Sequence, residues 1–347
     1  MPEPILTTRA LNRALLARQL LLERATLPIP TALDQLGGIQ NQYAPNAYIR
    51  LWSCLAGFDR DHLSRAYEDG SVVQGTLLRG TIHAVSAGDY HPIVAGIRRT
   101  RQEWSRRIHR GDDRRRGAVV ARVRRGLAGR TVTASELADL LGDADPTIQQ
   151  SIDTDAELLR VLPSGTWERR RANIYGLADD AIGHHDEVAE AEGLAHLVRR
   201  YLAGFGPASV RDIAEFSGVP VTPLKPVVAA MELRRFRDEE GKELLDVPDA
   251  PLPDGDTPAP VRFLPTWDAT LLVHARRTQI LPEMYRPMIF HTRMPPSYPT
   301  FLVDGQVAGT WRYEEGRVTL TPFGELAASV RRELDGEAER LTAFHAD

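Results

Sequence analysis

"TASELADLLGD" (residues 133–143) and "PASVRDIAEFSGVP" (residues 207–220) are two stretches of the chain that share one pattern. Each has a small residue where two helices would cross, Ala138 or Ala214, and a glycine at the following turn. That spacing is typical of a helix-turn-helix core, because a small side chain lets a second helix cross closely. A recurring pattern predicts tandem units more strongly than a single motif does.

The sequence around each core predicts further helices followed by a two-stranded hairpin, which is the order of a winged helix-turn-helix unit. Residues 117–127, 133–143 and 147–165 are predicted helices, with a hairpin at 166–178. Residues 192–206, 207–220 and 222–236 repeat the order, with a hairpin at 233–247. Near the N-terminus, helical patterns over residues 7–24, 29–38, 46–57 and 59–70 precede a hairpin at 71–86.

The predicted fold class is therefore mainly α with small β hairpins (α+β), built of three tandem winged-helix units and a C-terminal β-rich segment. Residues 1–95 form the first unit and contain a Gln-x-Gln motif. Residues 96–185 hold an Arg-rich connector and the second unit, and residues 186–250 form the third. Residues 251–347 form the β-rich domain, with turn pairs at 304–305 and 315–316 and a final helix over about 325–343.

Charge is unevenly distributed along the chain. The first 130 residues carry 21 arginines against 11 acidic residues, whereas the rest carries 22 basic and 36 acidic residues. Residues 98–125 alone hold 12 arginines and three acidic residues. Such a cluster is either a solvated helical face or a surface that follows phosphates. Arg106, Arg107 and Arg114 are the candidate DNA contacts within it.

Several other classes of protein are disfavoured by the sequence. Residues 1–13 lack the apolar core of a signal peptide and no run of about 18 apolar residues occurs, so we predict a cytoplasmic protein without a membrane partner.

The single cysteine, Cys54, excludes an internal disulfide and cysteine-bound zinc. Common nucleotide-binding and hydrolase motifs are missing. His184 and His185 lie in a polar connector with no third ligand in view, so no metal or cofactor is predicted.

Gln40 and Gln42 lie one residue apart in a short segment between a Gly-Gly pair and a proline. In an extended segment, alternate side chains point to the same side, so two neutral amides are held together. Their carbonyl and amino groups are suited to holding one water molecule or to straddling one ligand. Spacing alone leaves open that they are two polar residues on a solvated strand.

Four segments give the chain a family resemblance: "GGIQNQYAPNAYIRLWS" (37–53), "LLRGTIHAVSAGDY" (77–90), "FLPTWDATLLVHARRTQILPEMYR" (263–286) and "PTFLVDGQVAGTWR" (299–312). In this order they resemble the winged-helix DNA glycosylases of the AlkZ-like and YcaQ-like superfamily, over nearly the whole chain. The resemblance implies three tandem winged-helix units, a concave basic surface, and excision of N7- or N3-alkylated purines, including bulky adducts and interstrand crosslinks. It places the catalytic Gln-x-Gln motif on Gln40 and Gln42. The middle position is usually small or apolar in the family, and here it is Asn41.

The implied chemistry suits a glutamine. An N-alkylated purine carries positive charge and leaves readily, so a neutral amide that positions water under the developing oxocarbenium ion is sufficient. We assign water positioning to Gln42 and orientation of the water or sugar to Gln40. Arg79, Thr81 and His83, on the predicted polar face of the hairpin, are candidate groove contacts; an exposed strand face without function is the alternative.

The leading hypothesis is a monomeric, monofunctional DNA glycosylase acting on duplex DNA. Lys225 and Lys242 are the only lysines, which disfavours strand cleavage through a Schiff base. A non-catalytic winged-helix DNA-binding protein or transcriptional regulator is the main alternative, because glutamine also recognises adenine edges. A protein that sequesters a DNA-reactive small molecule is a third.

Overall fold

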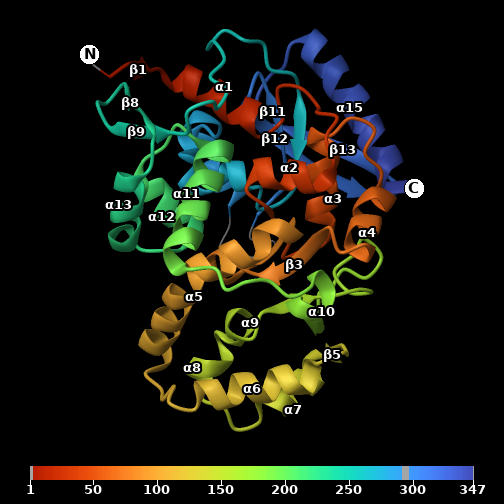
Figure 1. Cartoon of the computed structure of the whole chain (residues 1–347). Coiled ribbons are helices and arrows are strands. Elements are labelled where there is room, and N and C mark those ends of the chain that lie inside the picture. Colours follow the sequence, from red (N-terminus) through yellow and green to blue (C-terminus); the bar gives the residue numbers. More distant parts are fainter. Residues whose placement is uncertain (1–2, 291–296, 347) are drawn as a thin grey trace.

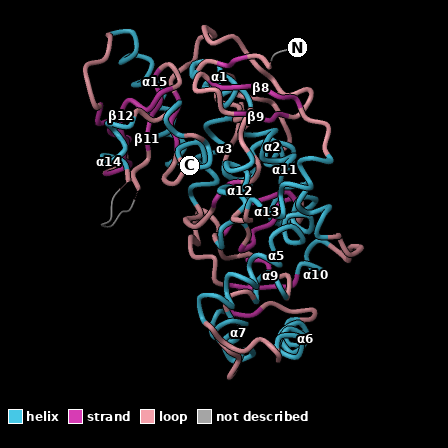
Figure 2. Tube along the Cα trace, turned by 90° about the vertical axis from the view of Figure 1, so that its left-hand side faces the viewer, coloured by secondary structure: helices cyan, strands magenta, loops and turns pink. Residues whose placement is uncertain are grey.

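The computed structural model describes residues 3–290 and 297–346 and has a mixed α+β architecture that contains winged-helix units, which confirms the predicted fold class (Figure 1). Helices α6 and α7 lie at one end of the molecule, and the C-terminal helix α15 lies at the other, in both orientations (Figures 1 and 2). The predicted domain limits at residues 95, 185 and 250 stay predictions.

The first unit contains α2, α3, α4 and a wing made of β3 and β4, as the sequence predicted. The elements up to the wing are α1 (Thr8–Arg18), α2 (Ile29–Leu36), β2 (Ile39–Gln40), α3 (Pro45–Cys54), α4 (Arg60–Glu68), β3 (Val72–Thr76), the 3-10 turn η1 (Leu78–Gly80) and β4 (Ile82–Ser86). Helix α1 ends earlier than predicted, at Arg18, and Leu20 follows with φ of 55°. The left-handed backbone at Leu20 cannot continue a helix.

The second unit differs from its prediction after the helix-turn-helix core. Its elements are α5 (Ala87–His109), α6 (Arg116–Leu127), β5 (Val132–Thr133), α7 (Ala134–Leu141), α8 (Pro146–Gln149), α9 (Ile152–Asp155), β6 (Leu158–Arg160), β7 (Ile174–Leu177) and α10 (Ala178–Ile182). The predicted third helix is split into α8 and α9, and its last part is strand β6. The wing therefore pairs β6 with β7, and the first part of the hairpin predicted at 166–178 belongs to the loop that connects these strands.

The third unit follows the prediction closely and recruits the N-terminus. It consists of α11 (Glu190–Phe205), α12 (Val210–Ser217), α13 (Val221–Ala230), β8 (Arg234–Asp238) and β9 (Glu243–Asp246). Strand β1 (Ile5–Leu6) pairs in parallel with β8. Arg18 of α1 is fully buried against Asp246, with Nη1 2.7 Å from Oδ1 and Nη2 2.9 Å from Oδ2. The N-terminal segment is thereby fixed to the third unit.

The C-terminal segment is the predicted antiparallel meander. It comprises β10 (Arg262–Leu264), 3-10 turns at Ala269–Leu271, Val273–Ala275, Arg277–Gln279 and Glu283–Tyr285, α14 (Arg286–Ile289), β11 (Thr300–Val303), β12 (Gln306–Glu314), β13 (Arg317–Pro322) and α15 (Ala328–Ala346). The strand order is β10-β11-β12-β13. Both predicted turn pairs have positive φ at their two residues, as a two-residue hairpin requires.

The wings of the first two units form one continuous sheet. Its strand order is β2-β4-β3-β6-β7-β5, and β3 joins β6 through the pairs Gln74–Arg160 and Gly75–Leu159. The first wing is therefore an interior part of this sheet. Its strands therefore lack the free edges that a terminal hairpin would have.

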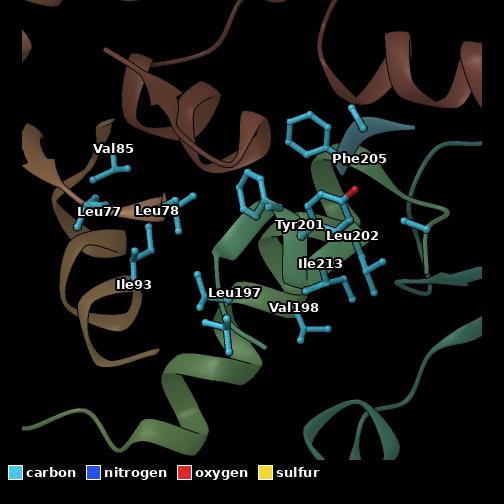
Figure 3. Close-up of a cluster of buried hydrophobic side chains, with 14 of the residues drawn as sticks. Leu77, Leu78, Val85, Ile93, Leu197, Val198, Tyr201, Leu202, Phe205 and Ile213 are labelled. Atoms are coloured by element: carbon cyan, nitrogen blue, oxygen red, sulfur yellow. The ribbon is translucent and has the colours of Figure 1, made fainter. Parts of the chain in front are cut away.

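The main core lies where α5 crosses α11 (Figure 3). Gly96 of α5 and Gly193 of α11 meet at this crossing, and a Cβ on Gly193 would lie 2.4 Å from the Gly96 nitrogen. The two backbones can approach this closely only because neither residue has a side chain. The crossing packs the third unit against the helix that follows the first wing.

Within residues 3–290 and 297–346, no helix is long and apolar enough to cross a membrane.

Candidate functional site

The Gln-x-Gln segment is positioned by a helix end and by the first wing. Helix α2 ends at Gly37, and both Gly37 (φ 75°) and Gly38 (φ 80°) have left-handed backbone. A Cβ on Gly38 would also lie 2.9 Å from Cγ1 of Val85. These glycines turn the chain sharply into β2, which pairs with β4 so that Gln40 lies opposite His83.

Asn41, the middle residue of the motif, holds the motif in place through hydrogen bonds. Its side chain is buried, and its Nδ2 donates to Oε1 of Gln74 at 2.7 Å, while Nε2 of Gln74 donates to the Gly165 carbonyl at 3.1 Å. The Asn41 backbone nitrogen also donates to the Ile82 carbonyl at 2.7 Å. This chain of amides runs from the motif through β3 to the loop of the second wing. Gln74 thus satisfies the amide nitrogen of this polar middle residue, whereas the buried Oδ1 of Asn41 has no hydrogen-bond partner.

The two glutamines differ in environment. Gln40 is half-buried, and its Oε1 accepts a hydrogen bond from Nη2 of Arg79 at 3.3 Å. Gln42 is exposed, and its Oε1 accepts from the backbone nitrogen of Ile82 at 3.2 Å. Each side chain is oriented by a contact to the first wing. A carbonyl oxygen has two lone pairs, so Gln42 keeps one for a further donor.

Arg79 is a partly buried cation that lies in the tight turn η1 with φ of 53°. Its Nη1 donates to the Phe216 carbonyl, and its guanidinium lies 5.7 Å from the centre of the Phe216 ring. Burial lowers the pKa of Arg79 to about 10, so the group stays charged at neutral pH. In the described part of the chain no carboxylate forms an ion pair with it. The positive charge of Arg79, beside Gln40, is thus available to an anion that the protein binds.

The predicted polar face of Arg79, Thr81 and His83 is wrong as a description of the first wing. His83 is buried, and its Nδ1 lies 3.0 Å from the Thr81 carbonyl. Burial, followed by the charge of Arg79, lowers the pKa of His83 to about 3, so it is neutral at pH 7. Thr81 is half-buried and donates through Oγ1 to the Leu78 carbonyl. The reason is that the whole of β4 is buried, because helices α2 and α5 pack against it.

The C-terminal segment also contributes residues to the surroundings of Gln40. Arg50 of α3 and Asp268 form a buried ion pair, with Nε 2.9 Å from Oδ2, and Gln40 lines a small pocket with both. Asn46 and Thr266 join the same two segments through two hydrogen bonds of 3.1 Å. Sequence analysis did not assign Asp268 to the site. Its position within the motif at 263–286 was the available signal.

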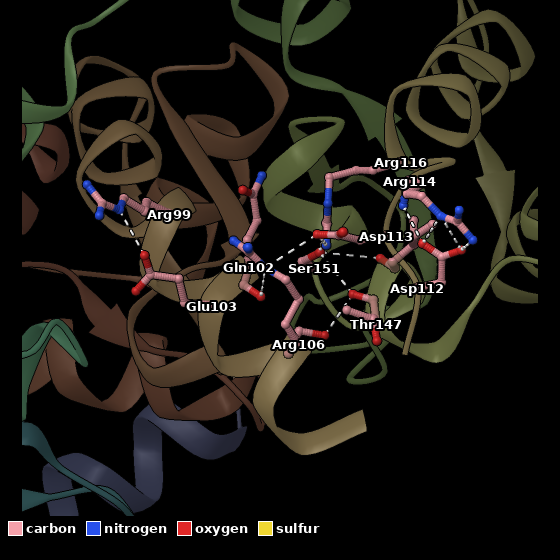
Figure 4. A network of polar contacts seen from close by, with 12 residues as sticks. Arg99, Gln102, Glu103, Arg106, Asp112, Asp113, Arg114, Arg116, Thr147 and Ser151 are labelled. Atoms are coloured by element: carbon pink, nitrogen blue, oxygen red, sulfur yellow. Dashed lines mark hydrogen bonds and ion pairs between the residues drawn. The ribbon is translucent and has the colours of Figure 1, made fainter. Parts of the chain in front are cut away.

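The Arg-rich segment is largely neutralised within the protein (Figure 4). Nε of Arg106 lies 3.3 Å from Oδ2 of Asp113, and Nη2 of Arg114 lies 2.7 Å from Oδ2 of Asp112. Arg107 has no such partner among the described residues and lines a cavity with Arg79. Of the three predicted phosphate contacts in this segment, only Arg107 has a guanidinium without an acidic partner in the described chain.

A second basic surface was missed by the sequence analysis. Arg169, Arg170 and Arg171 lie exposed in the loop of the second wing, and none forms an ion pair within residues 3–290 and 297–346. Nη1 of Arg170 donates to the hydroxyl of Tyr43 at 2.6 Å, next to Gln42. The triple arginine was visible in the sequence, but its closeness to Gln42 depends on the fold. We call Arg169–Arg171 the wing arginines.

The histidine pair in the connector does have partners, contrary to the sequence analysis. The fold brings His91 of α5 and Glu157 beside His185, and one donor atom from each lies within 4.8 Å of the others. Burial, and then the neighbouring His185, lower the pKa of His91 to about 4. These residues share no pocket with Gln40.

Comparison with known proteins agrees with this geometry. The family model described as DNA glycosylase AlkZ-like matches residues 33–344. The solved structure of Streptomyces sahachiroi DNA glycosylase AlkZ superposes with a TM-score of 0.80 at 16% identity, covering 99% of this chain and 97% of that chain. A search of curated proteins finds no match. Since the family model spans nearly the whole sequence, the chain belongs to the AlkZ-like family of DNA glycosylases.

Proposed function

We propose that this DNA glycosylase hydrolyses the N-glycosidic bond of N7- or N3-alkylated purines in duplex DNA, with Gln42 positioning the attacking water. The observation that carries the proposal is the geometry of Gln42, which is exposed and held at Oε1 by the Ile82 backbone nitrogen. One lone pair of that oxygen remains to accept a hydrogen bond from water. The amide is fixed before substrate arrives, so little reorganisation is needed during the reaction.

The leaving group explains why no strong base is required. Alkylation gives the purine a positive charge, and the bond to the sugar breaks as an oxocarbenium ion develops. A glutamine cannot remove a proton at neutral pH, but it can hold water near C1′ until the bond has largely broken. Asp268, a buried carboxylate that lines a pocket with Gln40, is neutralised by Arg50 and is assigned a structural role.

Gln40 orients the water or the sugar, and Arg79 orients Gln40. The Arg79 contact occupies one lone pair of the Gln40 oxygen and directs the amide nitrogen elsewhere. The charge of Arg79 suits a phosphate next to the lesion. Because Arg79 also donates to Phe216 in α12, it links the motif to the helix-turn-helix core of the third unit.

The phosphate contacts that we propose differ from those that the sequence predicted. The wing arginines and Arg107 replace Arg106 and Arg114 as the main phosphate contacts, since only the former have free charges in the described chain. A cavity of about 340 Å³ between α5 and α12 is lined by Arg79, Trp104 and Arg107. Trp104 is 38% exposed and offers an aromatic surface beside these cations. The protein is proposed to act on duplex DNA as a monomer.

The test is an excision assay with defined lesions. Duplexes carrying N7-methylguanine, a bulky N7 adduct or an N7 interstrand crosslink are incubated with wild-type protein and with Gln42→Ala. Free base is measured by mass spectrometry, and abasic sites by alkaline cleavage. We expect free base and an unbroken abasic strand, because lysine-mediated cleavage is disfavoured. The absence of released base from all three substrates contradicts the proposal, and comparison among them identifies the preferred adduct.

A further inference from the structure

We propose that His91, Glu157 and His185 form a binding site for one divalent transition metal ion of the Zn²⁺ class. The residues come from helix α5, from the position just before β6, and from the connector between the second and third units. Two imidazoles and a carboxylate are common zinc ligands, and three protein ligands leave a fourth position open. The proposal is independent of the excision chemistry.

The distances suit a shared ion. Nδ1 of His91 lies 3.6 Å from Oε2 of Glu157, and Nε2 of His185 lies 3.4 Å from the same oxygen. Tetrahedral ligands with bonds of about 2.0–2.1 Å are separated by roughly 3.3 Å. The two separations from Glu157 are thus already close to the value that a bound ion requires, and all three donor atoms lie within 4.8 Å of one another.

The hydrogen bonds around the cluster turn the donor atoms of His185 and Glu157 toward each other. Nδ1 of His185 lies 2.6 Å from the Asp186 carbonyl, which can only accept, so Nδ1 carries the proton and Nε2 presents its lone pair. Arg98 holds the other oxygen of Glu157, Oε1. Oε2 therefore faces the histidines. A carboxylate oxygen opposite a ring nitrogen lone pair needs a proton or a cation between them.

His91 supplies the most direct sign of a missing partner. Its side chain is 9% exposed, and neither ring nitrogen has a hydrogen-bond partner. A buried polar group without a partner is costly, and native structures rarely leave one. Its ring stacks on that of His185 with centroids 3.2 Å apart, so protonating both rings would place two cations face to face. A metal ion would bind one nitrogen of each ring without that repulsion.

The surroundings leave room for an ion and a fourth ligand. The three residues line a cavity of about 440 Å³ together with the exposed acidic residues Asp186 and Glu187. Glu157 also has a left-handed backbone (φ 55°), an uncommon conformation for a residue with a side chain. An ion here would join three segments far apart in sequence, so its binding is expected to stabilise the junction of the units.

The experiment uses the full chain after dialysis against EDTA. Co²⁺ is titrated while its visible absorption is recorded, Zn²⁺ is then added as a competitor, and thermal unfolding is followed with and without Zn²⁺. We expect saturation near one Co²⁺ per chain, displacement by Zn²⁺, and a higher Tm with Zn²⁺. His91→Gln and His185→Gln should each weaken Co²⁺ binding at least about 10-fold, because loss of even an outer-shell partner typically costs about 10- to 100-fold in metal affinity.

His184→Gln is the matched control, because His184 is the exposed neighbour of His185 and is not among the three ligands. It should bind Co²⁺ as the wild type does. The proposal is overturned if wild-type protein gives no saturable Co²⁺ absorption, or if His185→Gln, folded by circular dichroism, binds Co²⁺ with wild-type affinity.

Discussion

Arg79 donates a hydrogen bond to Gln40 across 3.3 Å, and no carboxylate in the described chain balances its charge. The contact joins the turn of the first wing to the Gln-x-Gln motif. Through the Phe216 carbonyl, it also joins both to the third unit. The proposed catalytic motif is therefore held by a cation whose charge is not neutralised within the described chain, which suits contact with a phosphate of DNA.

Replacing Gln42 by alanine should slow excision with little effect on affinity for undamaged duplex. The water contact contributes mainly in the transition state, so single-turnover release of N7-methylguanine should fall on the order of 10- to 1,000-fold. Gln40→Ala should have a smaller effect. Gln42→Glu should retain activity, because a carboxylate still accepts from water. Equal excision rates for wild type and Gln42→Ala would show that Gln42 takes no part in catalysis. If the DNA affinity of Gln42→Ala falls in proportion to its rate, Gln42 contacts DNA but has no catalytic role.

Arg79→Lys should lower excision even though the charge is kept. A lysine has a single nitrogen and cannot bond both Gln40 and Phe216 in the geometry of a guanidinium. Loss of a charge-assisted hydrogen bond corresponds to about 1.5–3 kcal/mol, or a roughly 10- to 100-fold slower single-turnover rate. Arg107→Lys is the control, since Arg107 is exposed and has no contact to the motif. If both lysine variants behave alike, Arg79 acts only through its charge.

Salt dependence of DNA binding should separate the two basic surfaces. Reversing the charges of Arg169 and Arg171 should reduce the slope of log K against log salt by about one unit for each phosphate that is no longer neutralised. Reversing Arg106 and Arg114, whose charges are paired with Asp113 and Asp112, should change it less. Fluorescence anisotropy with undamaged duplex at several salt concentrations measures both. A larger change for the second pair would restore the Arg-rich segment as the main DNA contact.

Gly193→Ala should destabilise the protein at the crossing of α5 and α11. Its Cβ would collide with backbone atoms of Gly96 and Pro92, which cannot move aside as a flexible side chain can. Overpacking of this kind costs about 1–3 kcal/mol in the free energy of unfolding, measured in urea. Gly117→Ala, in α6 with no atom within 4 Å of the added methyl group, should be neutral or slightly stabilising. Equal stabilities for the two variants would contradict the close crossing.

Acid should destabilise the protein through His83. The pKa of His83 is about 3 in the folded state and about 6.5 when unfolded, so between these values only the unfolded chain binds the proton. Stability therefore falls as pH decreases below about 6.5, by up to about 1.4 kcal/mol per pH unit. Urea unfolding at about pH 7 and pH 5 should show a loss in wild type about 2 kcal/mol larger than in His83→Gln. His184→Gln should keep the wild-type pH dependence, and an unchanged loss in His83→Gln would mean that His83 titrates normally.

Local sequence determined the elements and their order. Capping residues, glycines at helix ends and alternating patterns act over a few residues, so α2 ending at Gly37, the helix-turn-helix cores and the turns at 304–305 and 315–316 could be predicted. The motif at Gln40 and Gln42 was likewise visible, since it is contiguous. The prediction of one long third helix in the second unit was wrong because Leu158–Arg160 pairs with β3 and β7. Long-range pairing of this kind overrides local helix propensity.

Only the tertiary structure decided which charges and polar groups meet. The sequence placed His83 on an exposed face, but helices α2 and α5 pack against its strand and His83 is buried. The sequence grouped arginines by their proximity along the chain, but Arg106 and Arg114 are neutralised by Asp113 and Asp112. The wing arginines lie near Gln42 because Arg170 bonds to Tyr43, the residue after Gln42. The sequence left His185 without partners, and the fold brings in His91 and Glu157 from positions 94 and 28 residues away. Burial and ion pairing depend on distances between segments remote in sequence, which composition and periodicity do not encode.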